Sequence, residues 1–140
     1  MNKRIRRKIA KRTVVFNQTA HKTLWTWLAE KGSKRIPTSA TMLKTKWPGW
    51  ERNGGNIPHA AHCCMACQYA HTIRKKSKQY YRLPCRYCPL SIRGNTVKSD
   101  CLSGLYIEWE EAVEWNDIEE AKKIALKIAN LPVKKGVKTM

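Results

Sequence analysis

The sequence predicts an α-rich protein with a small zinc-knuckle, or zinc-ribbon-like, subdomain. Apolar residues recur at helical spacing near both ends of the chain, and two Cys-x2-Cys motifs lie between these stretches. With 140 residues, of which 42% are hydrophobic, the chain has the size and composition of one compact domain. We therefore expect one zinc-stabilised domain over residues 17–132, preceded by a basic arm (1–16) and followed by a basic tail (133–140) that is disordered from Lys134 onward.

The first residues form a strongly basic segment. Residues 2–12 are mostly Lys and Arg, with only Ile5, Ile9 and Ala10 as an apolar stripe. So narrow a stripe buries little surface. We expect a short arm or frayed helix that becomes ordered on a partner.

A firmer helix is predicted over residues 17–31. Asn17 can cap its first turn, and Gly32 stands where a helix commonly ends. Trp25 falls off the apolar stripe, so it either packs on another element or is available to a partner. The stripe itself consists of Ala20, Leu24, Trp27 and Leu28.

Residues 32–58 are rich in turn formers. Residues 40–47 could form one or two helical turns, and we expect little other regular structure here. Trp47 and Trp50 flank a Pro-Gly turn. We expect them to form a lid over the core of the zinc site, with stacking on bases as the alternative, because Trp side chains are mostly buried.

A helical hairpin is predicted over residues 103–131. Asp117 and Glu120 form an Asp-x-x-Glu capping box for the second helix, and Pro132 ends it. The joint between the two helices, residues 115–117, is tight enough for antiparallel packing. We expect contact through Leu105, Trp109, Val113, Ile118 and Ile128.

The cysteines in residues 59–101 carry the most specific signal. A Cys-x2-Cys turn brings two sulfurs to one cation, and two such turns complete the tetrahedron that Zn²⁺ prefers. The first pair and the second are separated by 17 residues, which fits the spacing of structural zinc sites. We predict one structural zinc, held by Cys64, Cys67, Cys85 and Cys88.

Four neighbouring residues leave the ligand set open to substitution. Cys63 adjoins the first pair and could replace Cys64, whereas Cys101 is expected to be buried near the site or to act as a substitute ligand. His62 and His71 flank the first motif, where we expect surface or supporting roles ahead of metal ligation.

Catalysis is not expected. Four thiolates leave no open position on the metal, and no carboxylate lies between Glu51 and Asp100 to act as an acid or a base. A deaminase would need a His-x-Glu motif, which the sequence lacks, and His59 and His62 do not form the pattern of a His-metal nuclease. We predict a binding protein.

The charge is large and uneven. The formal net charge is +18, and residues 1–107 hold 22 basic and 3 acidic residues against 6 and 7 in residues 108–140. The positive charges of residues 1–107 repel one another unless an anion binds them. Nucleic acid is the usual anion and a membrane surface the second. A basic surface without a specific partner is the simpler alternative.

Basic and aromatic residues alternate around the cysteine motifs. Phosphates would meet the cations and bases could stack on the tyrosines, although a solvated loop with core tyrosines explains the same pattern. We expect weak sequence specificity. The predicted contact residues are Lys3, Arg4, Arg6, Arg7, Lys8, Arg74, Lys75, Lys76, Lys78, Tyr80, Tyr81 and Arg82.

Targeting signals are not expected either. The basic start is not followed by the apolar run of a secretory signal, and no stretch of about 18 apolar residues predicts a membrane span. In a cytoplasmic protein six cysteines favour metal binding, whereas in a secreted one three disulfides would compete with it.

From Cys64 onward the pattern resembles small Cys-rich, zinc-knuckle proteins of phages and prophages of Gram-positive bacteria. The likeness covers Cys-x2-Cys-Gln-Tyr from Cys64, Cys-x2-Cys-Pro-Leu from Cys85, Cys-x3-Leu-Tyr-x2-Trp from Cys101 and Ala-x3-Ala-Asn-Leu-Pro from Ala125. It implies a phage origin and the cytoplasm of a bacterial host, and it implies no activity. The leading expectation is nucleic-acid binding of low specificity. The alternative is an inhibitor or adaptor that binds a host or defence protein.

Overall fold

The computed structural model describes residues 2–31, 40–51, 65–78, 87–91 and 104–139. This part of the chain is α-rich, as predicted, and its strands are only two residues long. In chain order the elements are α1 (Lys3–Thr13), β1 (Val15–Phe16), α2 (Gln18–Lys31), α3 (Ala40–Thr45), α4 (Met65–Ser77), α5 (Leu105–Glu114), α6 (Ile118–Ala129) and β2 (Lys138–Thr139).

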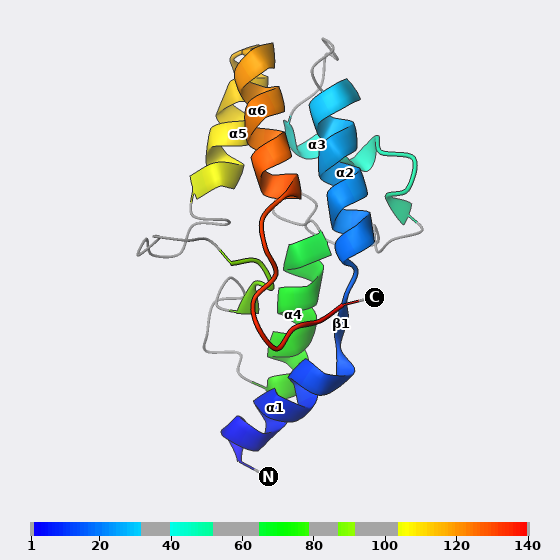
Figure 1. Cartoon of the computed structure of the whole chain (residues 1–140), viewed down its shortest axis with the longest axis vertical. Coiled ribbons are helices and arrows are strands. Elements are labelled where there is room, and N and C mark those ends of the chain that lie inside the picture. Colours follow the sequence, from blue (N-terminus) through cyan, green and yellow to red (C-terminus); the bar gives the residue numbers. More distant parts are fainter. Residues whose placement is uncertain (1, 32–39, 52–64, 79–86, 92–103, 140) are drawn as a thin grey trace.

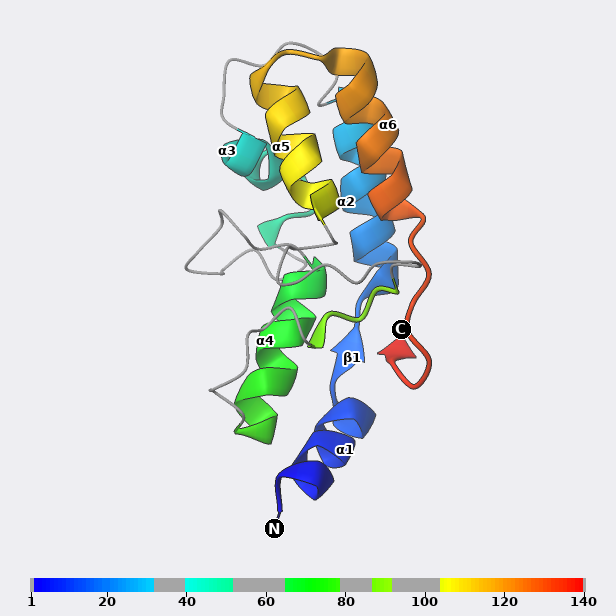
Figure 2. The same ribbon diagram turned by 90° about the vertical axis from the view of Figure 1, so that its left-hand side faces the viewer.

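These elements form two groups, one above the other in Figures 1 and 2. The upper group contains α2, α3, α5 and α6, which pack on one another. Its residues 17–31, 40–51 and 104–129 carry all six tryptophans, and we call it the Trp half. The lower group contains α1, β1, α4 and β2 with residues 2–16, 65–78, 87–91 and 130–139, and we call it the basic half.

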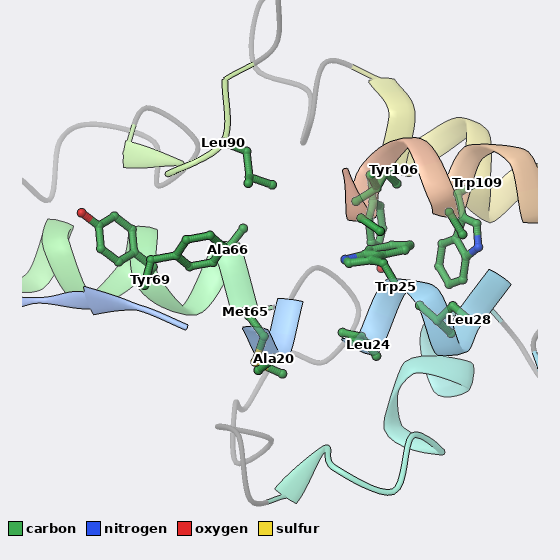
Figure 3. Close-up of a cluster of buried hydrophobic side chains, with 14 of the residues drawn as sticks. Ala20, Leu24, Trp25, Leu28, Met65, Ala66, Tyr69, Leu90, Tyr106 and Trp109 are labelled. Atoms are coloured by element: carbon green, nitrogen blue, oxygen red, sulfur yellow. The ribbon is translucent and has the colours of Figure 1, made fainter. Parts of the chain in front are cut away.

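Aromatic rings in edge-to-face contact form the core of the Trp half. The ring centroids of Trp25 and Trp109 are 5.0 Å apart at an interplanar angle of 80°, and the ring of Tyr106 lies 6.0 Å from that of Trp25. Figure 3 shows these three side chains meeting between α2 and α5. Edge-to-face contacts of this kind add to the stabilisation from burial. Trp25 therefore packs on another element, the first of the two roles expected for it.

The helices α5 and α6 are joined by residues 115–117 and pack on each other. Asp117 caps α6, since its Oδ1 accepts a hydrogen bond of 3.3 Å from the backbone N–H of Glu120. Trp109 and Ile128 are buried as expected, whereas Ile118 is exposed. Ile118 is the first residue of α6, directly after the joint, so it lies at the open end of the helix pair.

A smaller core holds the basic half together. Phe16 is fully buried, and its ring meets that of Tyr69 edge-on, with centroids 5.9 Å apart. The two halves join where α2 packs on α4, and Figure 3 places Met65 of α4 beside Ala20 of α2.

The C-terminal tail is ordered over residues 133–139, so the expectation of a disordered tail is wrong. β2 pairs in parallel with β1, in the register Val15 to Lys138 and Phe16 to Thr139. Further upstream, Ser91 N–H donates to Pro132 O and Lys134 N–H donates to Pro89 O, both at 2.7 Å. Backbone pairing, supported by Val133 and Val137 against the core, outweighs the polar composition of the tail.

Candidate functional site

α1 is a capped helix and not a loose arm. Asn2 caps its start, since Asn2 Oδ1 accepts a hydrogen bond of 2.9 Å from Ile5 N–H, and the N–H of Val14 closes its end on Ala10 O at 2.9 Å. Ala10 and Val14 are buried. α1 packs against α4 and β2 through this side, which explains why so basic a helix is ordered without a partner.

The apolar stripe expected on α1 is divided between two faces. Ala10 is buried, but Ile5 and Ile9 remain 45% and 42% exposed. At 100° per residue, Ile5 and Ile9 lie on the side away from Ala10 and Val14. The basic side chains surround this outer face: Lys3, Arg4, Lys8 and Arg12 are exposed, and Arg6 and Arg7 are half-buried.

α4 is a helix that the sequence analysis missed. Ala66, Tyr69, Ala70, Ile73 and Ser77 are buried along one side at helical spacing. The helical spacing of these apolar residues is present in the sequence and could have predicted the helix, but the segment was interpreted from its cysteine motifs alone. The last turn of α4 carries Arg74, half-buried, and Lys75 and Lys76, exposed, and Lys78 follows with a positive φ of 55°.

Two basic segments more than 60 residues apart in the chain thus meet in space. α1 and α4 contact each other, and both lie in the lower part of the molecule in Figures 1 and 2. The tail adds Lys134, Lys135 and Lys138, all exposed, which the sequence analysis did not select. The described residues of the basic half hold 14 Lys and Arg and no Asp or Glu.

Within the described residues of the basic half, this arrangement concentrates positive charge without any Asp or Glu in the same segments. Like charges on neighbouring helices raise the local potential and attract polyanions. The described residues of the Trp half, by contrast, hold 7 Lys and Arg and 9 Asp and Glu. The positive field therefore belongs to one end of the described structure.

Two of the predicted zinc ligands lie within the described residues. Cys67 lies in the first turn of α4, and Cys88 lies on residues 87–91, and both are half-buried against the core. The N-terminus of a helix favours an anionic ligand group, so the place of Cys67 in the first turn of α4 suits a metal ligand. Among the described residues no group of three or more His, Cys, Asp or Glu is placed to hold a metal.

Other predicted residues lie outside the described part of the chain. These are Cys64, Cys85, Cys63, Cys101, His62, Tyr80, Tyr81 and Arg82. His71 is described, and it lies exposed on α4. The four-thiolate site and the stacking tyrosines therefore remain predictions.

Two buried polar side chains in the Trp half were not anticipated. His21 Nε2 lies 2.9 Å from the backbone oxygen of Ile128, and burial, partly offset by this hydrogen bond, lowers the pKa of His21 from 6.5 to about 4. The imidazole is therefore neutral at pH 7, with Nε2 as the donor. Lys44 is buried as well, where its ammonium donates to Tyr106 Oη and lies 4.5 Å from the ring centroid. Both side chains link helices within the core, where a substrate has no access.

No helix in the described part of the chain combines the length and the apolar character needed to cross a bilayer. Comparisons with protein-family models, with curated proteins and with solved structures gave no match.

Proposed function

We propose that this protein binds nucleic acid with low sequence specificity and that one structural zinc stabilises it, in a phage or prophage setting within a bacterial host cell. The observation that carries the proposal is the meeting of the basic helices α1 and α4 at one end, together with the three tail lysines. Sequence reasoning selected the segments on α1 and α4 separately, and their contact supports a common surface.

The chemistry of this surface suits phosphates. Lys3, Arg4, Lys8, Lys75 and Lys76 are exposed on helices that are held in place by buried residues behind them. Cations on a fixed scaffold meet successive phosphates without an ordering cost for the backbone. Each phosphate that a cation neutralises releases counterions, so binding should weaken steeply as salt rises.

The exposed lysines of this surface favour low specificity. Lysine is a flexible point charge and does not read a base edge with fixed geometry. Contacts with the backbone position a nucleic acid but carry no sequence information. Tyr80 and Tyr81 would add stacking on single strands.

The proposed zinc would connect two parts of the basic half. With Cys64, Cys67, Cys85 and Cys88 as ligands, the metal would tie the start of α4 to residues 87–91. Structural zinc supplies folding free energy directly. The site would thus hold α4, and with it the surface shared with α1, inside the single domain that ends in the helical hairpin.

A second candidate is an inhibitor or adaptor that binds a host or defence protein. Trp115 favours it, because this side chain is 82% exposed between the acidic helix α5 and the first turn of α6, which holds Glu119 and Glu120. Exposed tryptophans are common anchors of protein interfaces. Trp25, the residue first considered for this role, is buried.

Two matched double variants test the proposal. Lys75→Gln/Lys76→Gln removes an exposed lysine pair from the basic half, and Lys122→Gln/Lys123→Gln removes an equivalent exposed pair from α6 in the Trp half. Gln keeps the helix propensity close to that of Lys. Mobility shifts with duplex and single-stranded probes across a salt series should show a steep loss of affinity with salt for the wild type.

The first pair should reduce the slope of log affinity against log salt by about 1–2, and the second should leave it unchanged. Equal effects of both pairs would mean diffuse attraction without a defined surface. If the wild type shifts no DNA or RNA at low salt, nucleic-acid binding is excluded. A host protein retained at high salt after nuclease treatment would then favour the second candidate.

A further inference from the structure

The joint between α5 and α6 exposes two large apolar side chains. Trp115 is 82% exposed and Ile118, three residues on, is 39% exposed. Large side chains gathered outside the core commonly mark interaction sites. This joint lies at the end of the molecule opposite α1 (Figures 1 and 2).

The chain on both sides of this joint is acidic, and the first cation of α6 is Lys122, one turn beyond Ile118. Residues 108–120, which we call the acidic tip, contain seven Asp and Glu and no Lys, Arg or His. Glu111, Glu114 and Glu119 are exposed beside the joint. A partner for this surface must combine apolar side chains with cations.

The outer face of α1 has that combination. Ile5 and Ile9 lie one helical turn apart and are 45% and 42% exposed. Arg4, Lys8 and Arg12 are exposed around them, and residues 2–16 contain no acid. A single chain cannot bring the two surfaces together, because they lie at opposite ends of the molecule.

We propose that the acidic tip docks onto α1 of a second copy of this chain. The ring of Trp115 covers Ile5 and Ile9 of the neighbour, while Lys8 and Arg12 of the neighbour face the carboxylates of the tip. Apolar contact supplies affinity, and the opposite charges fix the orientation.

Two different surfaces on opposite ends give an open, head-to-tail assembly and not a closed dimer. The net charge of +18 makes whole molecules repel each other at long range. At about 0.15 M salt the Debye length is about 8 Å, so distant basic groups are screened while groups in contact still attract. Association should therefore be strongest at intermediate salt and should weaken at both extremes.

Sedimentation or light scattering on nucleic-acid-free protein tests the proposal. At about 0.15 M salt the average mass of the wild type should rise with concentration beyond the 16.2 kDa of one chain, without a plateau at twice that value. Trp115→Ser removes the tip contact and Ile5→Ser/Ile9→Ser removes the α1 contact, so each variant alone should stay monomeric. Leu126→Ser is the control, since it changes an exposed apolar residue of α6 outside both surfaces and should associate like the wild type.

Mixing the two monomeric variants gives the sharpest result. One retains an intact α1 face and the other an intact tip, so the mixture should form a 1:1 complex and nothing larger. Circular dichroism should show all variants folded, because every changed residue is exposed. A wild type that stays monomeric at every concentration and salt, or a mixture that does not pair, would overturn the proposal.

Discussion

The Trp half and the basic half differ in what holds them together and in what they present to solvent. The Trp half has two indole rings in edge-to-face contact at its centre and a nearly balanced charge, with 7 basic and 9 acidic residues described. The basic half has one fully buried phenylalanine, a two-residue strand pair and 14 basic residues without an acid. The basic half therefore has both the smaller hydrophobic core and the stronger repulsion between like charges.

This difference suggests that the Trp half provides most of the stability and the basic half provides the binding surface. Like-charge repulsion destabilises a compact state, and an aromatic core offsets it best where the rings are large and buried. The basic half lacks such a core, so it depends on its attachment to α2, on the paired tail and, as we propose, on zinc. Binding and stability would then be built into different ends of one chain.

Removal of the metal should have the largest effect, and it should affect the two halves differently. We expect one zinc per chain by elemental analysis, lost in Ser variants of Cys64, Cys67, Cys85 or Cys88. Structural zinc in finger peptides contributes about 10–16 kcal/mol, so a chelator should unfold the middle of the chain. All six tryptophans report on the Trp half, so their fluorescence should change less than the far-ultraviolet circular dichroism.

Cys63→Ser and Cys101→Ser are the controls, and both should keep the metal. A metal-free wild type that unfolds in one cooperative transition would contradict the zinc prediction. Disulfides joining the four ligand cysteines would contradict it as well.

Replacement of a buried tryptophan should be the next largest effect. Trp109→Ala removes a ring that is 1% exposed and meets Trp25 edge-to-face, and it should reduce the free energy of unfolding by about 3–5 kcal/mol. Denaturant titration followed by circular dichroism measures this. Trp115→Ala, a matched change at an exposed ring, should cost less than about 0.5 kcal/mol. Equal losses in the two variants would show that the aromatic cluster is not the core of this half.

The pH dependence should be smaller, and it arises where the two halves adjoin. His21 takes up a proton near pH 6.5 when unfolded but only near pH 4 when folded. Its stabilising contribution is therefore complete above pH 6.5 and is lost as the pH falls towards 4. At pH 5 the free energy of unfolding should be about 2 kcal/mol lower than at pH 7.5.

His21→Gln provides the comparison for this loss. The Gln amide can still donate to the backbone oxygen of Ile128 but does not titrate. In urea unfolding at several pH values, the stability of the wild type relative to the variant should fall by about 2 kcal/mol between pH 7.5 and pH 5. Parallel curves would mean that His21 does not titrate as described.

Capping and apolar spacing predicted the Trp half well. Asn17 and Asp117 cap α2 and α6 as expected, because caps depend on local hydrogen bonds that sequence alone specifies. Trp25 fell off the expected stripe because α2 is buried on a broad face, against α6 and against the rings of α5. A search for one apolar stripe does not identify residues on a helix that is buried on two sides.

The basic half was predicted less well, for a physical reason. Its order depends on contacts between distant segments, such as α1 with α4 and residues 133–139 with residues 15–16 and 89–91. Two valines, Val133 and Val137, are too few to predict a packed tail from the sequence. They stabilise it only because the fold brings them against the hydrophobic core. The predicted ligands other than Cys67 and Cys88 lie outside the described residues, so the metal site stays a prediction.

The parallel pair of β1 and β2 has a consequence for the order of folding. Val15 pairs with Lys138, so this contact closes a loop of more than 120 residues. Closing a long loop before other contacts form is entropically costly, whereas α5 and α6 are separated by only three residues and can meet early. Once α6 has docked on α2, the tail that follows it is already held near β1. The end of the molecule with the highest positive charge should therefore be the last to assemble, and its rate of formation should depend on how quickly the opposite end forms.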